Sequence, residues 1–165
     1  MHLPKWLKSA TGFSMAAGGP TRSDTYLLNV QIEHPVSGAM INYGTFDKMT
    51  GGELSASTTS YRPGGMAPPV SLGGSKTTAN VVVSRLYRLE RDHSNCQQLL
   101  DGVGRCKMLV IRQPLDIEGN AYYGGKPITW SGVLDRVKFP DVDSESVTAG
   151  LLELEMVVEG FPSST

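Results

Sequence analysis

The sequence predicts a mainly β protein, an antiparallel sandwich or small barrel with one helix packed at an edge. Apolar and polar residues alternate with a period of two in several segments, which is typical of half-buried strands. The 19 glycines and 10 prolines among 165 residues supply many turns. Strands and helices do not alternate along the chain, which argues against a parallel doubly wound sheet.

About seven strands are expected from this alternation. They occupy residues 24–34, 39–49, 53–62, 78–89, 105–113, 128–139 and 148–159. Between the second and third of them, Thr50-Gly51-Gly52 predicts a hairpin turn, because glycine adopts positive φ without steric cost. The hairpin would therefore span about 39–62.

The single expected helix spans residues 92–101. Asp92 and Ser94 are both candidate N-caps, and Gly102 stands where a left-handed C-cap belongs. Apolar residues at helical spacing give this segment one face that can pack against the sheet.

The third expected strand is unusual, because residues 55–60 are polar on both faces. Such a strand cannot hold a core by itself and must keep at least one face in water. Two interpretations fit: a hairpin that lines a water-filled lumen built from several copies, or a solvated edge hairpin of a sandwich.

Residues 63–76 are expected to form a long loop that carries Met66, Val70 and Leu72. Because loops of this length in compact domains are usually functional or disordered, the apolar residues favour a contact loop over a floppy one. Residues 1–23 read as an N-terminal arm, either a frayed end or a segment that orders on a neighbouring copy. The main β domain is expected over 24–160, with a short C-terminal tail over 161–165.

Composition excludes several classes of protein. The 15 basic and 16 acidic residues give a net charge of -1, which argues against a basic domain that grips nucleic acid. Two cysteines form neither a disulfide framework nor a four-ligand zinc site. No apolar run approaches the roughly 20 residues that span a bilayer, and the start lacks the apolar core of a signal peptide. We therefore expect a soluble protein kept in a reducing cytoplasm, with no membrane binding.

A search for catalytic motifs finds only weak candidates. Residues 73–77 lack the order of a phosphate-binding loop, and a strand rather than a helix is expected after them. The three histidines are far apart in the sequence and lack metal-ligand spacing. No enzyme activity, cofactor or metal is expected.

Several ordered motifs carry a resemblance to a known family. They are Phe46-Asp47-Lys48, Gly51-Gly52-Glu53, Thr59-Ser60-Tyr61-Arg62-Pro63-Gly64-Gly65-Met66, Thr78-Ala79-Asn80-Val81-Val82-Val83-Ser84-Arg85-Leu86-Tyr87, Thr129-Trp130-Ser131-Gly132-Val133-Leu134 and Leu152-Glu153-Leu154-Glu155-Met156. Together, over about residues 24–160, they resemble the major tail tube proteins of tailed bacteriophages, which are related to the tubes of contractile tails and type VI secretion systems.

The resemblance implies two packed antiparallel sheets flanked by a helix, and a structural subunit that forms sixfold rings stacked into a hollow tube. DNA would pass through the lumen without specific binding. The inner wall would comprise 39–62 with strands near 105–115 and 128–138, and 63–76 would reach the adjacent ring. Partners would be further copies of the chain, the tape measure, the tail terminator and the tail tip or baseplate, in a virion tail assembled in the bacterial cytoplasm.

Two sets of residues follow as candidates, because a DNA conduit needs a neutral or acidic wall and stacked rings need apolar contacts. The lumen candidates are Asp47, Glu53, Ser55, Ser57, Thr59, Asp116 and Glu118. The contact candidates are Trp6, Phe13, Arg62, Pro63, Met66, Pro69, Val70, Leu72, Tyr122 and Tyr123.

One alternative from another class remains open. A monomeric β sandwich or barrel could bind a small ligand or a carbohydrate on aromatic stacking platforms, for which Trp130, Tyr122 and Tyr123 are the candidates. The competing interpretation of the tyrosine pair is an exposed hairpin tip or a subunit contact.

Overall fold

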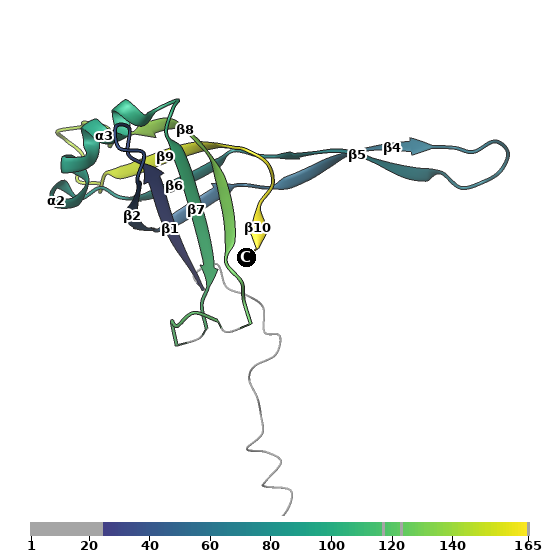
Figure 1. The fold of residues 1–165 in the computed structure, drawn as a ribbon, viewed down its shortest axis with the longest axis horizontal. Helices are drawn as coiled ribbons and strands as arrows, with labels where there is room; N and C mark the ends of the chain where they lie inside the picture. The colour runs from purple at the N-terminus through teal and green to yellow at the C-terminus, as the bar shows by residue number, and fades with distance from the viewer. Residues whose placement is uncertain (1–24, 117, 123, 165) are drawn as a thin grey trace, which may run out of the picture.

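The structure, a computed structural model, describes residues 25–116, 118–122 and 124–164 (Figure 1). The predictions made for the N-terminal arm, including Trp6 and Phe13, and for Tyr123 lie outside these residues. Within the described part, no helix has both the length and the apolar character needed to cross a membrane.

One antiparallel sheet forms the body, with strands in the order β2-β1-β7-β8-β9-β6-β3. Its strands are β1 (Tyr26–Glu33), β2 (Met40–Phe46), β3 (Lys48–Gly51), β6 (Val81–Leu86), β7 (Lys107–Pro114), β8 (Ile128–Lys138) and β9 (Leu151–Val158), and the short β10 (Ser163–Ser164) pairs with β8. The two end strands, β2 and β3, are consecutive in the chain and separated by Asp47 alone. The Asp47 N–H donates to the Ser84 carbonyl at 3.0 Å, so one bent segment joins both ends of the sheet into a partial barrel.

The core lies inside this curled sheet, because alternate residues of each strand point inward. Val30, Val110, Leu134, Leu154 and Met156 come from four different strands and are all 0% exposed. Each fully buried aliphatic side chain of this kind contributes about 1.5–3 kcal/mol. The body therefore has a complete core of its own.

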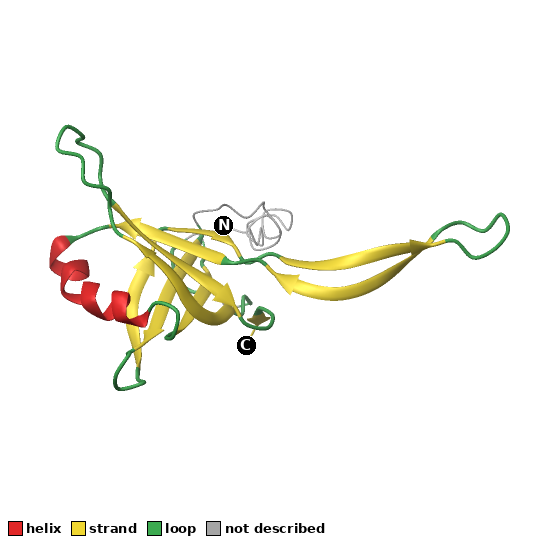
Figure 2. Ribbon diagram, turned by 90° about the horizontal axis from the view of Figure 1, so that it is seen from above, coloured by secondary structure: helices red, strands yellow, loops and turns green. Residues whose placement is uncertain are grey.

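Strands β4 (Leu54–Tyr61) and β5 (Val70–Thr78) form a separate two-stranded sheet. This hairpin projects away from the body in both views (Figures 1 and 2). We call it the arm, and from here on the word refers to this hairpin and not to the N-terminal residues. Every residue of β4 is exposed, as is every residue of β5 except Thr78. The arm is thus a part of the described chain that does not pack against the hydrophobic core of the body.

The arm corrects two predictions. The hairpin expected over 39–62 is wrong, because β2 pairs with β1 whereas β4 pairs with β5. The expected loop 63–76 is wrong in its second half, where the chain is already in β5, so the loop between the strands covers 62–69. Gly51 and Gly52, with φ of +81° and +77°, explain the first error, because they redirect the chain out of the body instead of folding it back. The second error arises because β5 is exposed on both faces and contains Gly73-Gly74, so it lacks the sustained alternation of a half-buried strand.

A helical segment packs at one end of the body, as expected, but it begins earlier than predicted. It runs through α2 (Leu89–Asp92), the 3-10 turn η1 (His93–Asn95) and α3 (Cys96–Gly102). Neither Asp92 nor Ser94 caps its start, since the N-cap of α2 is Arg88. Gly102 is the last residue of α3 rather than the residue beyond it, and a Cβ there would lie 3.0 Å from the Cys106 sulfur.

Candidate assembly surface

The register of the arm assigns its side chains to two different faces. Thr59 pairs with Leu72 and Tyr61 with Val70, and paired residues of an antiparallel ladder share a face. Alternate pairs lie on the opposite face, where Thr58 meets Gly73 and Ser60 meets Ser71. In the distal half of the arm, one face thus carries Tyr61, Val70 and Leu72, and we call it the apolar face. The other carries Thr58, Ser60 and Ser71, and we call it the polar face.

The side chains of the apolar face are unusually exposed to solvent for apolar residues. Tyr61, Val70 and Leu72 are 58%, 50% and 53% exposed, and Met66 in the tip loop is fully exposed. Large apolar side chains that gather on one exposed surface often mark an interaction site, whereas single exposed apolar side chains are common on any protein surface. The apolar face is therefore the strongest candidate for a contact surface on the described chain.

The arm also exposes two strand edges. Among the described residues, β4 and β5 pair only with each other, so the outer N–H and C=O groups of both strands lack ladder partners. Free edges of this length are templates for pairing with another strand. A β-bulge on β5 lies between the two halves, where Gly74 packs so closely that a Cβ would lie 2.4 Å from the Ser57 hydroxyl oxygen.

The root of the arm is tied firmly to the body. The buried Trp130 donates from its indole Nε1 to the Gly52 carbonyl at 3.1 Å, and the Thr78 hydroxyl donates to the Gly160 carbonyl at 3.0 Å. The Ala79 N–H donates to the Glu53 carbonyl at 2.9 Å. These bonds fix the direction in which the arm leaves the body, although none of the described residues covers its outer part.

A buried ion pair holds the helical segment on the line where the two ends of the sheet meet. Arg85 on β6 and Asp92 are 2% and 1% exposed, and Arg85 Nη2 lies 2.5 Å from Asp92 Oδ1. The same guanidinium donates to the Tyr43 carbonyl on β2 at 2.5 Å and lies over the Phe46 ring, 4.4 Å from its centroid. One side chain thus joins β6, β2 and the helical segment.

The electrostatics of Asp92 follow from its partners. Burial by itself raises the pKa of this carboxyl, but hydrogen bonds from Arg91 and from the Arg88 N–H, together with the Arg85 charge, lower the pKa below its ordinary value overall. The carboxyl is consequently ionised at neutral pH, and the pair acts as a fixed structural link.

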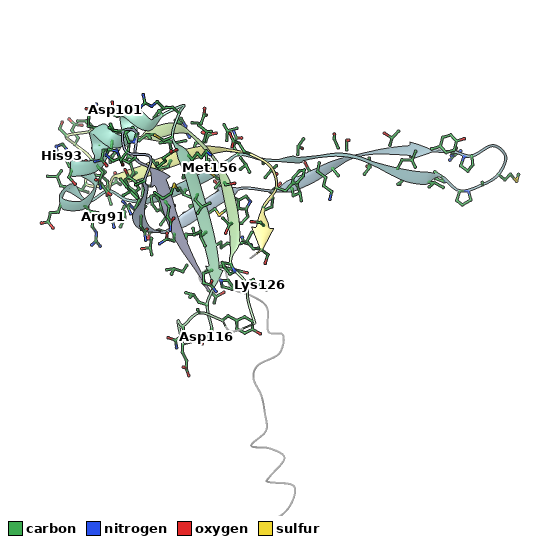
Figure 3. The ribbon with its side chains drawn as sticks, viewed as in Figure 1. Arg91, His93, Asp101, Asp116, Lys126 and Met156 are labelled. Atoms are coloured by element: carbon green, nitrogen blue, oxygen red, sulfur yellow. The ribbon has the colours of Figure 1, made fainter. Side chains whose placement is uncertain are left out.

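The lumen candidates are divided among four places. Ser55, Ser57 and Thr59 share one face of β4, the same face that bears Tyr61. Glu53 lies at the arm's root, and Asp47 lies between β2 and β3, where its carboxylate accepts from the Leu86 N–H at 3.3 Å. Asp116 and Glu118 belong to the turn beyond β7, which Figure 3 shows at the end of the body away from the helical segment.

The contact candidates fall into two groups. Arg62, Pro63, Met66 and Pro69 lie in the tip loop, next to Val70 and Leu72 on β5. Tyr122 lies instead in the turn near Asp116, where it is 48% exposed. The structure therefore brings most contact candidates together on the arm, but it also places Leu72 directly opposite the lumen candidate Thr59. The two assignments compete for one face.

Sequence reasoning missed the arm itself, although a signal was present. Val70-Ser71-Leu72 alternates apolar with polar residues, as a strand does, before the glycine pair that interrupts the pattern. Together with the strand expected over 53–62, this short alternation is typical of a hairpin over residues 53–78 with its turn near Pro63-Gly64-Gly65.

The aromatic binding site of the alternative does not form around Trp130. This side chain is 5% exposed, and its indole N–H is bonded to the Gly52 carbonyl, so its ring is not available as a stacking platform. Across 25–116, 118–122 and 124–164, no group of three or more His, Cys, Asp or Glu side chains is placed to hold a metal ion.

Comparison with solved structures places this fold in a class. An extracellular contractile injection system provides two similar chains: one from the PVC sheath/tube terminator (TM-score 0.60, 15% identity, 91% of this chain and 99% of that one) and one from the PVC sheath–tube complex (TM-score 0.55, 16% identity, 92% and 96%). A chain of the sixfold-symmetrised anti-feeding prophage baseplate is also similar (TM-score 0.58, 15% identity, 87% and 95%). No protein-family model matches the sequence, and no curated protein is similar enough to count as a relative.

These likenesses confirm the predicted fold class. The chain has a mainly β, tail-tube-like fold of two antiparallel sheets with one flanking helical segment. They also support, at the level of the fold, the resemblance to tail tube proteins that the sequence motifs suggested.

Proposed function

We propose that this chain is a structural, non-enzymatic subunit of the tube in a phage tail or a phage-tail-like particle. Copies join side by side into sixfold rings, and the rings stack into a hollow conduit for DNA. The observation that carries the proposal is the arm: a two-stranded hairpin with an exposed apolar face and two free edges, attached to a body whose core is already complete.

The physical argument concerns the fate of the free edges. An isolated two-stranded hairpin is marginally stable in water, and its edges invite uncontrolled pairing. In a ring, the β4 edge of one arm can meet the β5 edge of the next, which continues an antiparallel sheet around a closed circle. Closure then satisfies the backbone groups of every copy at once.

The charge of the arm also favours a conduit. The tip and distal half of the arm, residues 58–75, contain one charged residue, Arg62, and the basic Lys76 lies nearer the root, opposite Ala56. DNA is held by lysine and arginine through counterion release, so a wall built from hydroxyl side chains releases a moving polyanion easily. This supports a passage that DNA crosses without being bound.

The solved neighbours support an assembly role of this kind. Their descriptions name a tube terminator, a sheath–tube complex and a sixfold-symmetrised baseplate. Carried to this chain, they favour partners at the two ends of the tube, a terminator or cap and a baseplate or tail tip, with a tape measure inside. The particle would assemble in the cytoplasm of the bacterial host.

Electron microscopy of the purified full chain tests the proposal. We expect rings or tubes with sixfold symmetry and a continuous central channel. Size-exclusion chromatography adds a second measurement, since a monomeric binding module would elute near 17.7 kDa at every concentration. A protein that stays monomeric and shows no particles would contradict the proposed function.

A further inference from the structure

The two faces of the arm differ in chemistry: in its distal half, one face is apolar and the opposite face is polar. On the apolar face, Thr59 and Leu72 form one cross-strand pair and Tyr61 and Val70 the next. On the polar face, the corresponding pairs join Thr58 to Gly73 and Ser60 to Ser71. The residues of the polar face are small, and each carries a hydroxyl group or no side chain at all.

Resting on the proposed function, we infer that the arm is two-sided in the assembled ring. The apolar face, formed by Tyr61, Val70 and Leu72, packs on a neighbouring copy of the same chain, whereas the polar face, formed by Thr58, Ser60 and Ser71, lines the water-filled channel. On β4 the channel would then be lined by Thr58 and Ser60, which alternate along the strand with Thr59, the lumen candidate predicted from the sequence.

The packing side follows from the hydrophobic effect. Three large side chains that are half exposed or more gain free energy when another surface covers them, and no part of the described chain does so. Serine and threonine hydroxyls lose water if they are buried without hydrogen-bond partners, so the polar face is the less costly one to leave wet.

A second copy is the occupant that fits best. Strands of eight and nine residues reach about 25–30 Å from the root, which carries the apolar face beyond its own body. The arm carries two basic residues, Arg62 and Lys76, and no acidic one, whereas the whole chain has a net charge of -1, so the remainder of a second copy is net acidic and complements the arm. Edges that match both β4 and β5 in length and direction are supplied by another arm of the same kind.

A matched pair of variants tests the inference. Leu72→Asn and Ser71→Asn introduce the same residue at neighbouring positions of β5 that point to opposite faces. The body should fold equally well in both, because among the described strands β5 pairs with β4 alone. Far-ultraviolet circular dichroism and the thermal midpoint check this. We expect Leu72→Asn to raise the critical concentration of assembly about tenfold or more, while Ser71→Asn changes it less than about twofold.

Chemical labelling of the assembled protein gives an independent measurement. In a Cys96→Ser background, where the remaining Cys106 is buried, Ser71→Cys should react with a small maleimide in the polymer and in the monomer alike. Leu72→Cys should react in the monomer and become protected in the polymer. Sedimentation velocity separates the two populations before the labelled fraction is measured by mass spectrometry.

The possible results separate the inference from the proposed function. If wild-type protein assembles but Ser71→Asn is as disruptive as Leu72→Asn, or the labelling pattern is reversed, the assignment of faces is wrong while the tube remains. If Leu72→Asn assembles like the wild type, the apolar face is not the packing face. A wild-type chain that never assembles overturns both.

Discussion

At the scale of single residues, the most consequential contact is the ion pair between Arg85 and Asp92. Both side chains are almost fully buried, and the guanidinium bonds at once to the helical segment and to β2. Removing one partner of such a pair leaves an uncompensated charge in a low-dielectric interior, which costs far more than the intact pair contributes. The pair therefore acts as a specific lock between the helical segment and the sheet.

Asp92→Asn tests this role. We expect the free energy of unfolding to fall by about 3–5 kcal/mol, because Arg85 keeps its charge but loses its carboxylate partner. Denaturant titration followed by tryptophan fluorescence measures the change. Glu90→Gln on the same helical segment is the control: the side chain is exposed, and its substitution should change stability by less than about 0.5 kcal/mol.

The pH dependence of stability provides a second test at this scale. Since the pKa of Asp92 is lower in the folded protein than in the unfolded chain, its contribution is complete above the unfolded pKa of about 3.9 and is lost as the pH falls through the folded pKa. The difference in stability between wild type and Asp92→Asn should be constant from about pH 5 to 7 and shrink below about pH 4. A difference that grows on acidification would contradict this assignment.

These residues also show where prediction from sequence stops. Aspartate is one of the residue types favoured at helix N-caps, and the position of Asp92 before the helical apolar pattern supports its interpretation as an N-cap. Its actual partner, Arg85, lies on a strand, and their meeting depends on how the helical segment turns back over the sheet. A local pattern contains no information on such a contact, so the helix was predicted and the lock was not.

At the scale of elements, the arm owes its direction to two glycines. Gly51 has φ of +81°, and a Cβ there would lie 1.9 Å from the Asn80 carbonyl oxygen, so no side chain fits at this turn. Gly52 also has positive φ, and its carbonyl is fixed by Trp130. The turn is consequently a rigid exit from the body rather than a flexible hinge.

Gly51→Ala should therefore destabilise the protein by about 2–4 kcal/mol, through backbone strain and the overlap with Asn80 together. Gly104→Ala is the matched control, because Gly104 has nearly the same φ of +79°, but in the described part of the chain no atom lies within 4 Å of the added Cβ. That variant should lose only about 1–2 kcal/mol from strain. Equal losses in thermal denaturation would show that the close approach at Asn80 does not matter.

The same turn explains which elements the sequence could predict. Alternation identified the strands of the body, since one buried face gives each a clear period of two, as in the buried positions of β9. In the arm both faces are wet, so β4 and β5 lack that constraint and the pairing was assigned to the wrong neighbour. The pair Gly51-Gly52 indicates a turn in either case. The residue types alone do not show whether the chain folds back on the preceding strand as a hairpin or leaves the body.

At the scale of the whole molecule, the structure divides into a body that is complete and an arm that is not. Apart from Cys106, between α3 and β7, the core residues belong to the body sheet and the helical segment, while β4 and β5 contribute none of them. Stability and assembly are therefore encoded in different parts of the chain, and it should be feasible to remove one without the other.

Deletion of the arm tests this division. Residues 55–77 can be replaced by a two-residue Asn-Gly turn, because Leu54 and Thr78 are direct cross-strand partners at the root. We expect a folded variant with a thermal midpoint within a few degrees of the wild type, since the buried core is untouched. Because the apolar face and both free edges are gone, the variant should sediment as a monomer at concentrations where the wild type forms rings or tubes. Ordered rings from the armless chain would mean that the strand edges of the body drive assembly. An unfolded variant would contradict the division, because it would show that the body needs the arm for stability although the arm contributes no core residue.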